Sequence, residues 1–360
     1  MTSLLSRGRL QLSGALLALA TVAMPAHPAE PDVITYAAPG SISSSLAPYF
    51  YARELGYLTQ ENLKLDVVIL QGSGEIIPQL VKGSITASMI TPDVLISSRQ
   101  PGRPNFPLHF VYNVFRKSVW QIAVLENSPL QAVKDLKGKT VGVGALTFAN
   151  VVQTKSLLRR NDIDPSGTSF VAVGSGGPAL EALRTGKIDA LNHHVMLLTQ
   201  LEAQGTKIRR LPYPPEFADI SSHGLIFSDK VIKERPDLIV RFGRVLAKGT
   251  VACKANPDAC LSAYWAAYPE QKPSDSNATP RERRVLAVAI DTMTAFPAGG
   301  PTQFGRYDER DWSATIDSLK QGGEVAAGSN IPLESVYTNQ FIDEINKFDA
   351  AAVVRQAKAN

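Results

Sequence analysis

The sequence predicts an α/β protein of two similar lobes, each built on a mainly parallel sheet with flanking helices. The first observation is an internal repeat: residues 65–93 (LDVVILQGSGEIIPQLVKGSITASMITPD) recur as residues 168–194 (TSFVAVGSGGPALEALRTGKIDALNHH). The second halves of the copies align at a constant offset of 103, which pairs Gly83 with Gly186 and Ala87 with Ala190. The first halves need one gap. Each copy is typical of an apolar strand, a Gly-Ser-Gly turn, an amphipathic helix ended by glycine and a second strand.

The second observation is that the repeat extends upstream. Residues 33–45 and 139–152 each run from a short apolar strand through a glycine-containing turn into a helix. Each lobe is therefore expected to be a βαβαβ unit, whose crossovers are right-handed and whose sheet is buried on both faces. A single duplication at this spacing favours two homologous domains over a solenoid. Because open α/β sheets bind ligands at the carboxyl ends of their strands, we expect a cleft between the lobes.

The N-terminus predicts export. Arg7 and Arg9 precede an apolar run over residues 10–24, and no acidic residue occurs before Glu30. This order is typical of a secretory signal peptide, which we assign to residues 1–29, and the run is short for a membrane span. A disordered or amphipathic surface tail is the alternative. No cysteine near the expected cleavage region offers a lipid attachment site, so the sequence predicts a free periplasmic protein.

Composition and cysteine content narrow the function further. The chain has 37 Lys plus Arg and 33 Asp plus Glu, and without Arg7 and Arg9 the balance is 35 against 33, which does not indicate nucleic-acid binding. Cys253 and Cys260 flank an Asn-Pro-Asp turn between two predicted helices, and a local disulfide is expected in an exported protein. Buried thiols are the alternative. The spacing of Cys253 and Cys260 matches neither a zinc-binding nor a redox motif. We therefore expect no metal and no other cofactor.

Beyond Ser222 the pattern becomes mainly helical up to the C-terminus. A helical tail of this length must cover one of the lobes, and we assign it to lobe one. The expected organisation is lobe one from residues 30–116 and 223–360, with lobe two from residues 117–222.

The order of these features resembles that of the periplasmic solute-binding proteins of nitrate/sulfonate/taurine-type ABC importers, which include binders of thiamine pyrimidine precursors. The resemblance covers nearly the whole mature chain. It implies a type II periplasmic-binding fold, in which the chain crosses twice between the lobes, here near residues 115–118 and 220–225. It also implies a receptor without enzymatic activity. The matching stretches are YFYARELGYLTQENLKLDVV, LVKGSITASM, NSPLQAVKDLKGKTVGVG, ALRTGKIDAL and SVYTNQFIDEI.

The strand-to-helix turns supply most candidate ligand-binding residues. Unpaired backbone N–H groups and the helix dipole make converging helix N-termini suitable for a carboxylate, sulfonate or phosphate. Ordinary helix capping is the alternative for each of these side chains. The candidates at such turns are Ser41, Ser43, Ser44, Ser73, Gly74, Thr147 and Ser175.

The repeat register adds candidates at the ends of two strands. At the offset of 103, Thr91 corresponds to His194, and His193 precedes it. These histidines are expected to face the cleft, where they would donate to an acidic ligand or accept from a hydroxyl, and capping or a hinge role is the alternative. The resemblance implies an acidic residue in this neighbourhood, from which two histidines depart. Thr91 and His194 are expected to face each other across the cleft.

Three further candidates lie near the first crossing or in a lobe-two turn. Asn113 and Arg116 follow the strand that enters the crossing, and Arg116 is the best placed cation for a bidentate contact with an anion. A surface hinge arginine is the competing interpretation. Phe148 begins a predicted helix, where it would stack on a planar ligand or belong to the core.

The sequence therefore predicts a monomeric periplasmic receptor that closes on a small organic anion with a planar or apolar body and delivers it to the transmembrane subunits of an ABC permease. Sulfonates, aromatic carboxylates and pyrimidine-like solutes fit this description. One alternative is an exported enzyme acting on a small heterocycle or ester, although no G-x-S-x-G motif occurs. Another is a ligand-loaded sensor that docks on a signalling receptor.

Overall fold

The computed structural model describes residues 30–40, 42–70, 72–218, 220–274, 278–298 and 302–360. The chain divides into a short unit, Met1–Glu30, and a compact unit, Pro31–Asn360, which holds both sheets. The predicted signal peptide, residues 1–29, lies outside the described residues. Within the described ranges, no helix combines the length and apolar character that crossing a bilayer requires.

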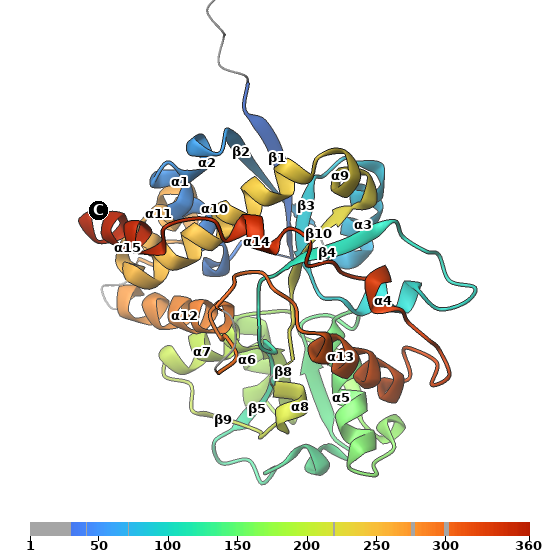
Figure 1. Cartoon of the computed structure of the whole chain (residues 1–360). Coiled ribbons are helices and arrows are strands. Elements are labelled where there is room, and N and C mark those ends of the chain that lie inside the picture. Colours follow the sequence, from blue (N-terminus) through green and yellow to red (C-terminus); the bar gives the residue numbers. More distant parts are fainter. Residues whose placement is uncertain (1–29, 41, 71, 219, 275–277, 299–301) are drawn as a thin grey trace, which may run out of the picture. The chain divides into compact units, whose positions relative to one another are not determined.

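The first sheet has the strand order β2-β1-β3-β10-β4 (Figure 1). β1 pairs in parallel with β2 and β3, whereas β10 runs antiparallel to both β3 and β4, so four of these strands share one direction. β3 and β10 are buried along their whole length, as expected of inner strands covered on both faces. The strands are β1 (Asp32–Pro39), β2 (Leu63–Leu70), β3 (Ala87–Ile90), β4 (Leu108–Asn113) and β10 (Gly224–Ser228).

The second sheet has the order β7-β6-β8-β5-β9. β6 pairs in parallel with β7 and β8, and β5 runs antiparallel to β8 and β9. Its strands are β5 (Trp120–Leu125), β6 (Thr140–Val143), β7 (Ser169–Ala172), β8 (Ala190–His194) and β9 (Ile208–Arg210).

The two sheets repeat one topology, as the sequence predicts. β3 and β8 carry the second strand of each repeat copy and occupy equivalent central positions in separate sheets. Each copy begins its helix after a glycine with a positive φ, Gly72 (φ 75°) and Gly176 (φ 66°). Gly83 (φ 75°) and Gly186 (φ 73°), which follow the two helices, also have a positive φ. Because L side chains rarely adopt this backbone, the repeated glycines explain why the repeat is visible in sequence. The predicted two-lobed α/β fold is confirmed.

The chain passes between the sheets twice. β4 ends at Asn113 in the first sheet and β5 begins at Trp120 in the second, while the return lies between β9 and β10. In each sheet, the strand that follows a crossing is the one that runs against its neighbours.

Helices cover the sheets and form their cores. On β1, Tyr36 packs with Tyr49 and Phe242 on one face, while Ala37 belongs to the cluster of Trp312 on the other, which is the alternation expected of a strand. The lobe-one helices are α1 (Ala47–Glu54), α2 (Tyr57–Gln60), α3 (Ser73–Lys82), α4 (Asp93–Ser98) and α9 (Asp229–Glu234). The lobe-two helices are α5 (Ala149–Arg160), α6 (Gly177–Arg184), α7 (Val195–Ala203) and α8 (Pro215–Ala218).

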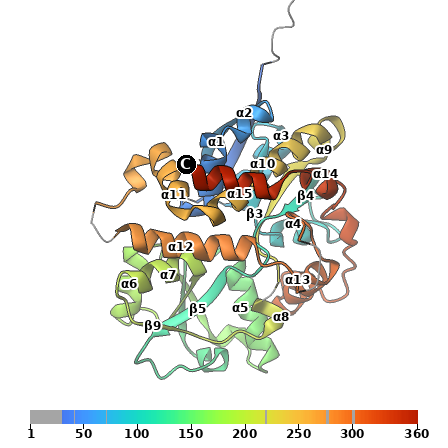
Figure 2. The same cartoon turned by 60° about the vertical axis from the view of Figure 1, so that its left-hand side comes forward.

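The C-terminal helices, which the sequence assigns to lobe one, pack on lobe one and also contact lobe two. α10 and α11 pack on α1, whereas α12 packs on α7 and α13 on α5. Figures 1 and 2 show α12 running beside α7, and Figure 1 shows α13 next to α5. The tail therefore bridges the sheets. These helices are α10 (Pro236–Ala255), α11 (Pro257–Ala267), α12 (Ala278–Met293), α13 (Glu309–Gly322), α14 (Ile342–Ile345) and α15 (Ala350–Ala359).

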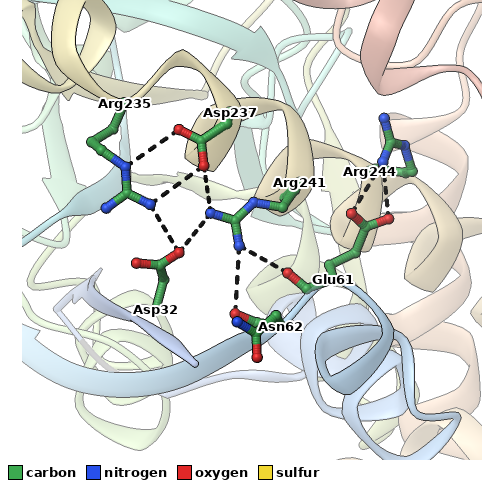
Figure 3. A network of polar contacts seen from close by, with 7 residues as sticks. All are labelled: Asp32, Glu61, Asn62, Arg235, Asp237, Arg241 and Arg244. Carbon is green, nitrogen blue, oxygen red and sulfur yellow. Dashed lines mark hydrogen bonds and ion pairs between the residues drawn. The ribbon is translucent and has the colours of Figure 1, made fainter. Parts of the chain in front are cut away.

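Lobe one carries two further ties. Cys253 and Cys260 form the predicted disulfide between the end of α10 and α11, with their Cα atoms 5.1 Å apart. At the start of β1, the Asp32 carboxylate accepts hydrogen bonds from Arg235 (2.8 Å) and Arg241 (2.6 Å) (Figure 3). Arg241 also donates to the carbonyl oxygen of Glu61 (2.9 Å), which joins α10 to the β1–β2 edge.

Candidate functional site

A cavity of about 440 Å³ lies between the two sheets and is the candidate site. Its walls come from the carboxyl ends of strands in both lobes and from the C-terminal helices. Among the described residues, the aromatic lining consists of Phe115, Trp120 and Tyr264, with Met89 and Met196 beside it. The polar lining consists of Ser43, Ser44, Ser45, Ser175, His194, Gln200, His223, Gln271 and Glu282.

Ser175 forms part of the lobe-two wall and is oriented by a buried histidine. It lies in the turn between β7 and α6, and its Oγ is 3.0 Å from Nε2 of His193. Nδ1 of His193 accepts a hydrogen bond from the backbone N–H of His194 (3.0 Å). His193 is only 1% exposed, and burial together with the neighbouring His194 lowers its pKa to about 2. The imidazole is therefore neutral at physiological pH.

His194 and His223 line the same region. His194 caps α7, where its Nδ1 accepts from the backbone N–H of Leu197 (3.1 Å). Burial lowers the pKa of His194 to about 4, and burial and the proximity of His194 lower that of His223 to about 3. Both rings are neutral between pH 5 and pH 8, so neither acts as a charge switch in that range.

The opposite wall combines serines with side chains from distant helices. Ser43 and Ser45, at the short 3₁₀ turn that precedes α1, share a hydrogen bond of 2.7 Å. Tyr264 comes from α11 and Glu282 from α12. Burial raises the pKa of the Glu282 carboxyl above its ordinary value.

The described lining holds one ionisable carboxylate, Glu282, and contains neither lysine nor arginine. Its remaining polar groups are hydroxyls, amides and neutral imidazoles, which recognise a ligand through hydrogen bonds rather than charge. The indole N–H of Trp120 is buried and has no hydrogen-bond partner among the described residues. No group of three His, Cys, Asp or Glu side chains within the described residues is arranged to hold a metal ion.

Four of the predicted residues, Ser43, Ser44, Ser175 and His194, line this cavity. Ser41 lies outside the described residues. Ser73 and Gly74 open α3 and Thr147 lies in an exposed turn, and none of the three is among the residues of the wall. His193 stands behind Ser175, as described above.

Phe148 supports the wall from behind. Its ring packs 5.8 Å from that of Trp120, which itself faces the cavity. The absence of a side chain at Gly144 makes room for it, because a Cβ there would approach Phe148 to 2.8 Å and Nε2 of His193 to 3.0 Å. Trp120 lines the cavity, whereas Phe148, the residue predicted to stack on a ligand, packs against Trp120 and is not among the described lining residues.

Thr91 does not face His194 across the cavity as expected. It lines a separate small cavity of about 10 Å³ together with Asp93 and Ser318, between α4, α5 and α13. The sheets repeat one another, but α13 and the second crossing enclose the end of β3 on that side.

Arg116 and Asn113 lie in a polar cluster at the crossing, and neither is among the described cavity-lining residues. The Arg116 guanidinium donates to the carbonyl oxygen of Arg306 (2.9 Å) and lies over the ring of Phe296, 5.1 Å from its centroid. Asn113 donates to the hydroxyl of Ser221 (2.7 Å). Arg116 follows the end of β4, as predicted. Its guanidinium, however, contacts Arg306 and Phe296 of the C-terminal part of the chain.

Sequence reasoning missed several wall residues. Trp120 stands at the first position of β5, and His223 lies on the second crossing just before β10. A tryptophan directly after a predicted crossing is a signal that would have drawn attention to it. Tyr264 and Glu282 carry no local signal, because only the packing of α11 and α12 against the lobes brings them to the site.

Comparisons with known proteins identify the family of this chain and structures that share its fold. The family model described as "NMT1/THI5 like" matches residues 43–260, more than half of the chain. The riboflavin-binding protein RibY of Chloroflexus aurantiacus is 22% identical over 336 residues, which cover 90% of this chain and 91% of RibY.

Solved structures share the fold at lower identity. The periplasmic aliphatic sulphonate-binding protein SsuA of Escherichia coli superposes with a TM-score of 0.64 at 15% identity, over 86% of this chain and 93% of SsuA. A mutant of DSZB in complex with biphenyl-2-sulfinic acid gives a TM-score of 0.57 at 15% identity, over 88% and 99% of the two chains. Another structure names DSZB as a desulfurization enzyme, so the same fold occurs in binding proteins and in an enzyme.

Proposed function

This chain belongs to the NMT1/THI5-like family, and we propose that it is the periplasmic solute-binding component of an ABC importer for a planar heteroaromatic solute of the pyrimidine or flavin class. In this proposal the exported, monomeric protein closes its lobes on the solute and delivers it to the transmembrane subunits of the permease. The proposed boundaries are lobe one from residues 30–116 and 223–360 and lobe two from residues 117–222.

The lining of the cavity carries the proposal. A volume of about 440 Å³ accommodates a small organic molecule. Phe115, Trp120 and Tyr264 offer flat apolar surface, and neutral hydroxyls and imidazoles offer directed hydrogen bonds. This combination suits a flat ring system that carries polar atoms at its edge.

The same lining argues against the anionic ligands that the sequence predicts. A buried sulfonate or carboxylate requires a cation or several converging N–H groups to replace its hydration. The described wall contains neither lysine nor arginine, its Glu282 would repel an anion, and Arg116 lies elsewhere. The N–H groups at the starts of α6 and α7 are therefore the groups left to bind an anion there. Of the predicted solute classes, the pyrimidine-like one fits best, and the riboflavin-binding relative supports the extension to flavins.

A hydrolytic role is not supported by the most enzyme-like pair in the site. A serine nucleophile needs a histidine nitrogen that can take its proton. Nδ1 of His193 already accepts a backbone N–H, so in the neutral ring the proton stands on Nε2, which faces Ser175. His193 therefore cannot act as the base for Ser175. Both cysteines are bonded to each other and offer no thiol.

The proposal is tested with protein exported to the periplasm and purified without added ligand. Native mass spectrometry identifies a co-purified solute, and calorimetric titration compares riboflavin and uracil with taurine and MOPS. We expect the heteroaromatic compounds to bind and the sulfonates not to bind. Tight binding of sulfonates alone would overturn the ligand class, and turnover of any of these compounds would overturn the receptor role.

Two tryptophan variants, one in the cavity wall and one in the lobe-one core, locate the binding. Trp120→Ala should weaken the affinity for the bound heteroaromatic compound by about 10- to 100-fold, because a stacking surface in the wall is lost. Trp312→Phe serves as the control, since Trp312 packs between Tyr307 and Tyr337 in the lobe-one core and should leave affinity unchanged. Equal affinities of both variants and wild type would place the ligand elsewhere.

A further inference from the structure

We infer that His193, which stands behind the cavity wall, fixes the hydrogen-bond polarity of lobe two, so that Ser175 and His194 present donors to a carbonyl-bearing edge of the ligand. This inference rests on the proposed function. It narrows the ligand from heteroaromatic compounds in general to cyclic lactams and diones, and it assigns to His193 a positioning role.

The position of the proton on His193 follows from its neighbours. A backbone N–H can only donate, so Nδ1 of His193, 3.0 Å from the N–H of His194, must be the unprotonated nitrogen. The single ring proton is then on Nε2. That nitrogen lies 3.0 Å from Oγ of Ser175, to which it can donate but from which it cannot accept. The ring also forms a hydrogen bond with the backbone of Gly174.

The hydroxyl hydrogen of Ser175 is consequently available to the cavity. Oγ receives the hydrogen bond from His193, and a protonated Nε2 cannot accept one in return. Ser175 is part of the cavity wall, so the direction left to its hydrogen is toward a ligand. The second lone pair of Oγ remains an acceptor, but an acceptor on the ligand is needed to satisfy the hydroxyl hydrogen.

The position of the ring proton on His194 follows from the same argument. The backbone N–H of Leu197 donates to its Nδ1 (3.1 Å), which places the ring proton on Nε2. His194 also lines the cavity. Two neighbouring side chains of lobe two thus present hydrogens whose direction is set by backbone N–H groups rather than by the ligand.

A buried donor without a partner carries a large desolvation cost, so this wall discriminates by polarity. A carbonyl oxygen or an unprotonated ring nitrogen satisfies Ser175 and His194. An amino group in the same place leaves both hydrogens without an acceptor. The expected ligands therefore carry carbonyl groups, as pyrimidine and pteridine diones and isoalloxazines do, whereas their amino-substituted counterparts are excluded.

The binding test uses two probes with one ring system and opposite polarity, pteridine-2,4-dione and 2,4-diaminopteridine. In wild type, calorimetry should show at least about tenfold tighter binding of the dione, the discrimination expected when a site's polar groups are left unpaired. Ser175→Ala and His193→Phe should each reduce this preference, and the double variant should reduce it no further, because His193 acts through Ser175. A purely structural role of His193 would weaken both probes equally. Ser166→Ala, at an exposed serine of lobe two, is the control for substitution itself.

The outcomes separate this inference from the proposed function. If both pteridines bind with equal affinity, the proposed function stands and the inference is wrong. If neither these probes nor riboflavin binds, both are wrong. Preferential binding of the diamino compound would also overturn the inference.

A second measurement needs neither a ligand nor a variant. Long-range ¹H–¹⁵N NMR spectra of the imidazoles distinguish the two neutral tautomers. We expect His193 and His194 as Nε2–H tautomers at pH 7. An Nδ1–H tautomer at His193 would reverse the direction of its bond to Ser175 and overturn the inference.

Discussion

The two lobes repeat one topology but contribute different chemistry to the cavity. β3 and β8 hold the same place in their sheets, yet β3 continues into Thr91, which faces a separate small cavity, while β8 ends at His194 in the wall. Lobe one contributes instead the serines before α1 and the helices of the C-terminal tail. The comparison teaches that a duplicated fold repeats positions, whereas later elements decide which of those positions stay open to a ligand.

The lobes also differ in what stabilises them. Lobe one is tied by the disulfide, by α10 and by the charged cluster at Asp32. Lobe two contains His193 and His194 as neutral, largely buried imidazoles. A pH low enough to protonate histidine should therefore destabilise lobe two and the second crossing, where His223 lies.

The largest expected effect is a loss of stability in acid. An imidazole whose folded pKa lies below its unfolded value of about 6.5 binds fewer protons when folded, so stability falls as the pH drops below that value. With folded pKa values of about 2, 4 and 3 for His193, His194 and His223, each should cost about 2 kcal/mol between pH 7 and pH 5. Urea unfolding at both pH values measures the change. His194→Gln should reduce the loss by about a third, and an unchanged loss in that variant would contradict the assignment.

A substitution of one glycine in each lobe should give a loss of stability of intermediate size and compares how tightly the two lobes are packed. At Gly249, a Cβ would lie 2.2 Å from the backbone carbonyl oxygen of Pro48, so α10 and α1 must separate to admit it. At Gly142, a Cβ would lie 2.4 Å from Cδ1 of Ile188, a flexible side-chain end that can turn away. Gly249→Ala should cost about 3 kcal/mol and Gly142→Ala about 1 kcal/mol. Urea unfolding at pH 7 measures the free energy of unfolding of both variants. A larger loss in Gly142→Ala would show that α1 and α10 separate more easily than the lobe-two core rearranges.

The smallest expected effect concerns the charged cluster of Figure 3. Asp32 bonds to Arg235 and Arg241, but its side chain keeps 31% of its exposure and water screens the pairs. Asp32→Asn should therefore cost less than about 1 kcal/mol, and the difference from wild type should shrink in 1 M salt. Unfolding curves at low and high salt check this. Because Arg235 is the main cause of the lowered pKa of Asp32, its contribution should be lost as the pH falls through the carboxyl range. A salt-independent loss of several kcal/mol would show that the cluster anchors β1.

Much of the fold was predictable because its signals are local. Gly72 and Gly176 have a positive φ at the helix starts, and each lies between two apolar strands of its repeat copy. The disulfide was also predictable, because an Asn-Pro-Asp turn lies between two cysteines only seven residues apart in a chain expected to be exported. The extent of the helical tail was predictable, but its attachment to lobe two was not.

The site was predictable only in part. Ser43, Ser44, Ser175 and His194 follow strand ends or helix starts, and this position alone placed them at the cavity. Arg116 also follows a strand end, a position equally suitable for binding a ligand. Its guanidinium instead donates a hydrogen bond to the carbonyl oxygen of Arg306, 190 residues away. Sequence spacing contains no information about which partner such a side chain finds.

The sequence by itself determined the two βαβαβ lobes, the cleft edge and the disulfide, because strand and helix periodicity and glycine conformation depend on near neighbours. The tertiary structure alone decided the chemistry of the cleft. Packing of α11 and α12 brought Tyr264 and Glu282 to the wall, and burial held the imidazoles neutral. Backbone N–H groups then set the direction of their protons, which depends on atoms that only the folded chain brings together.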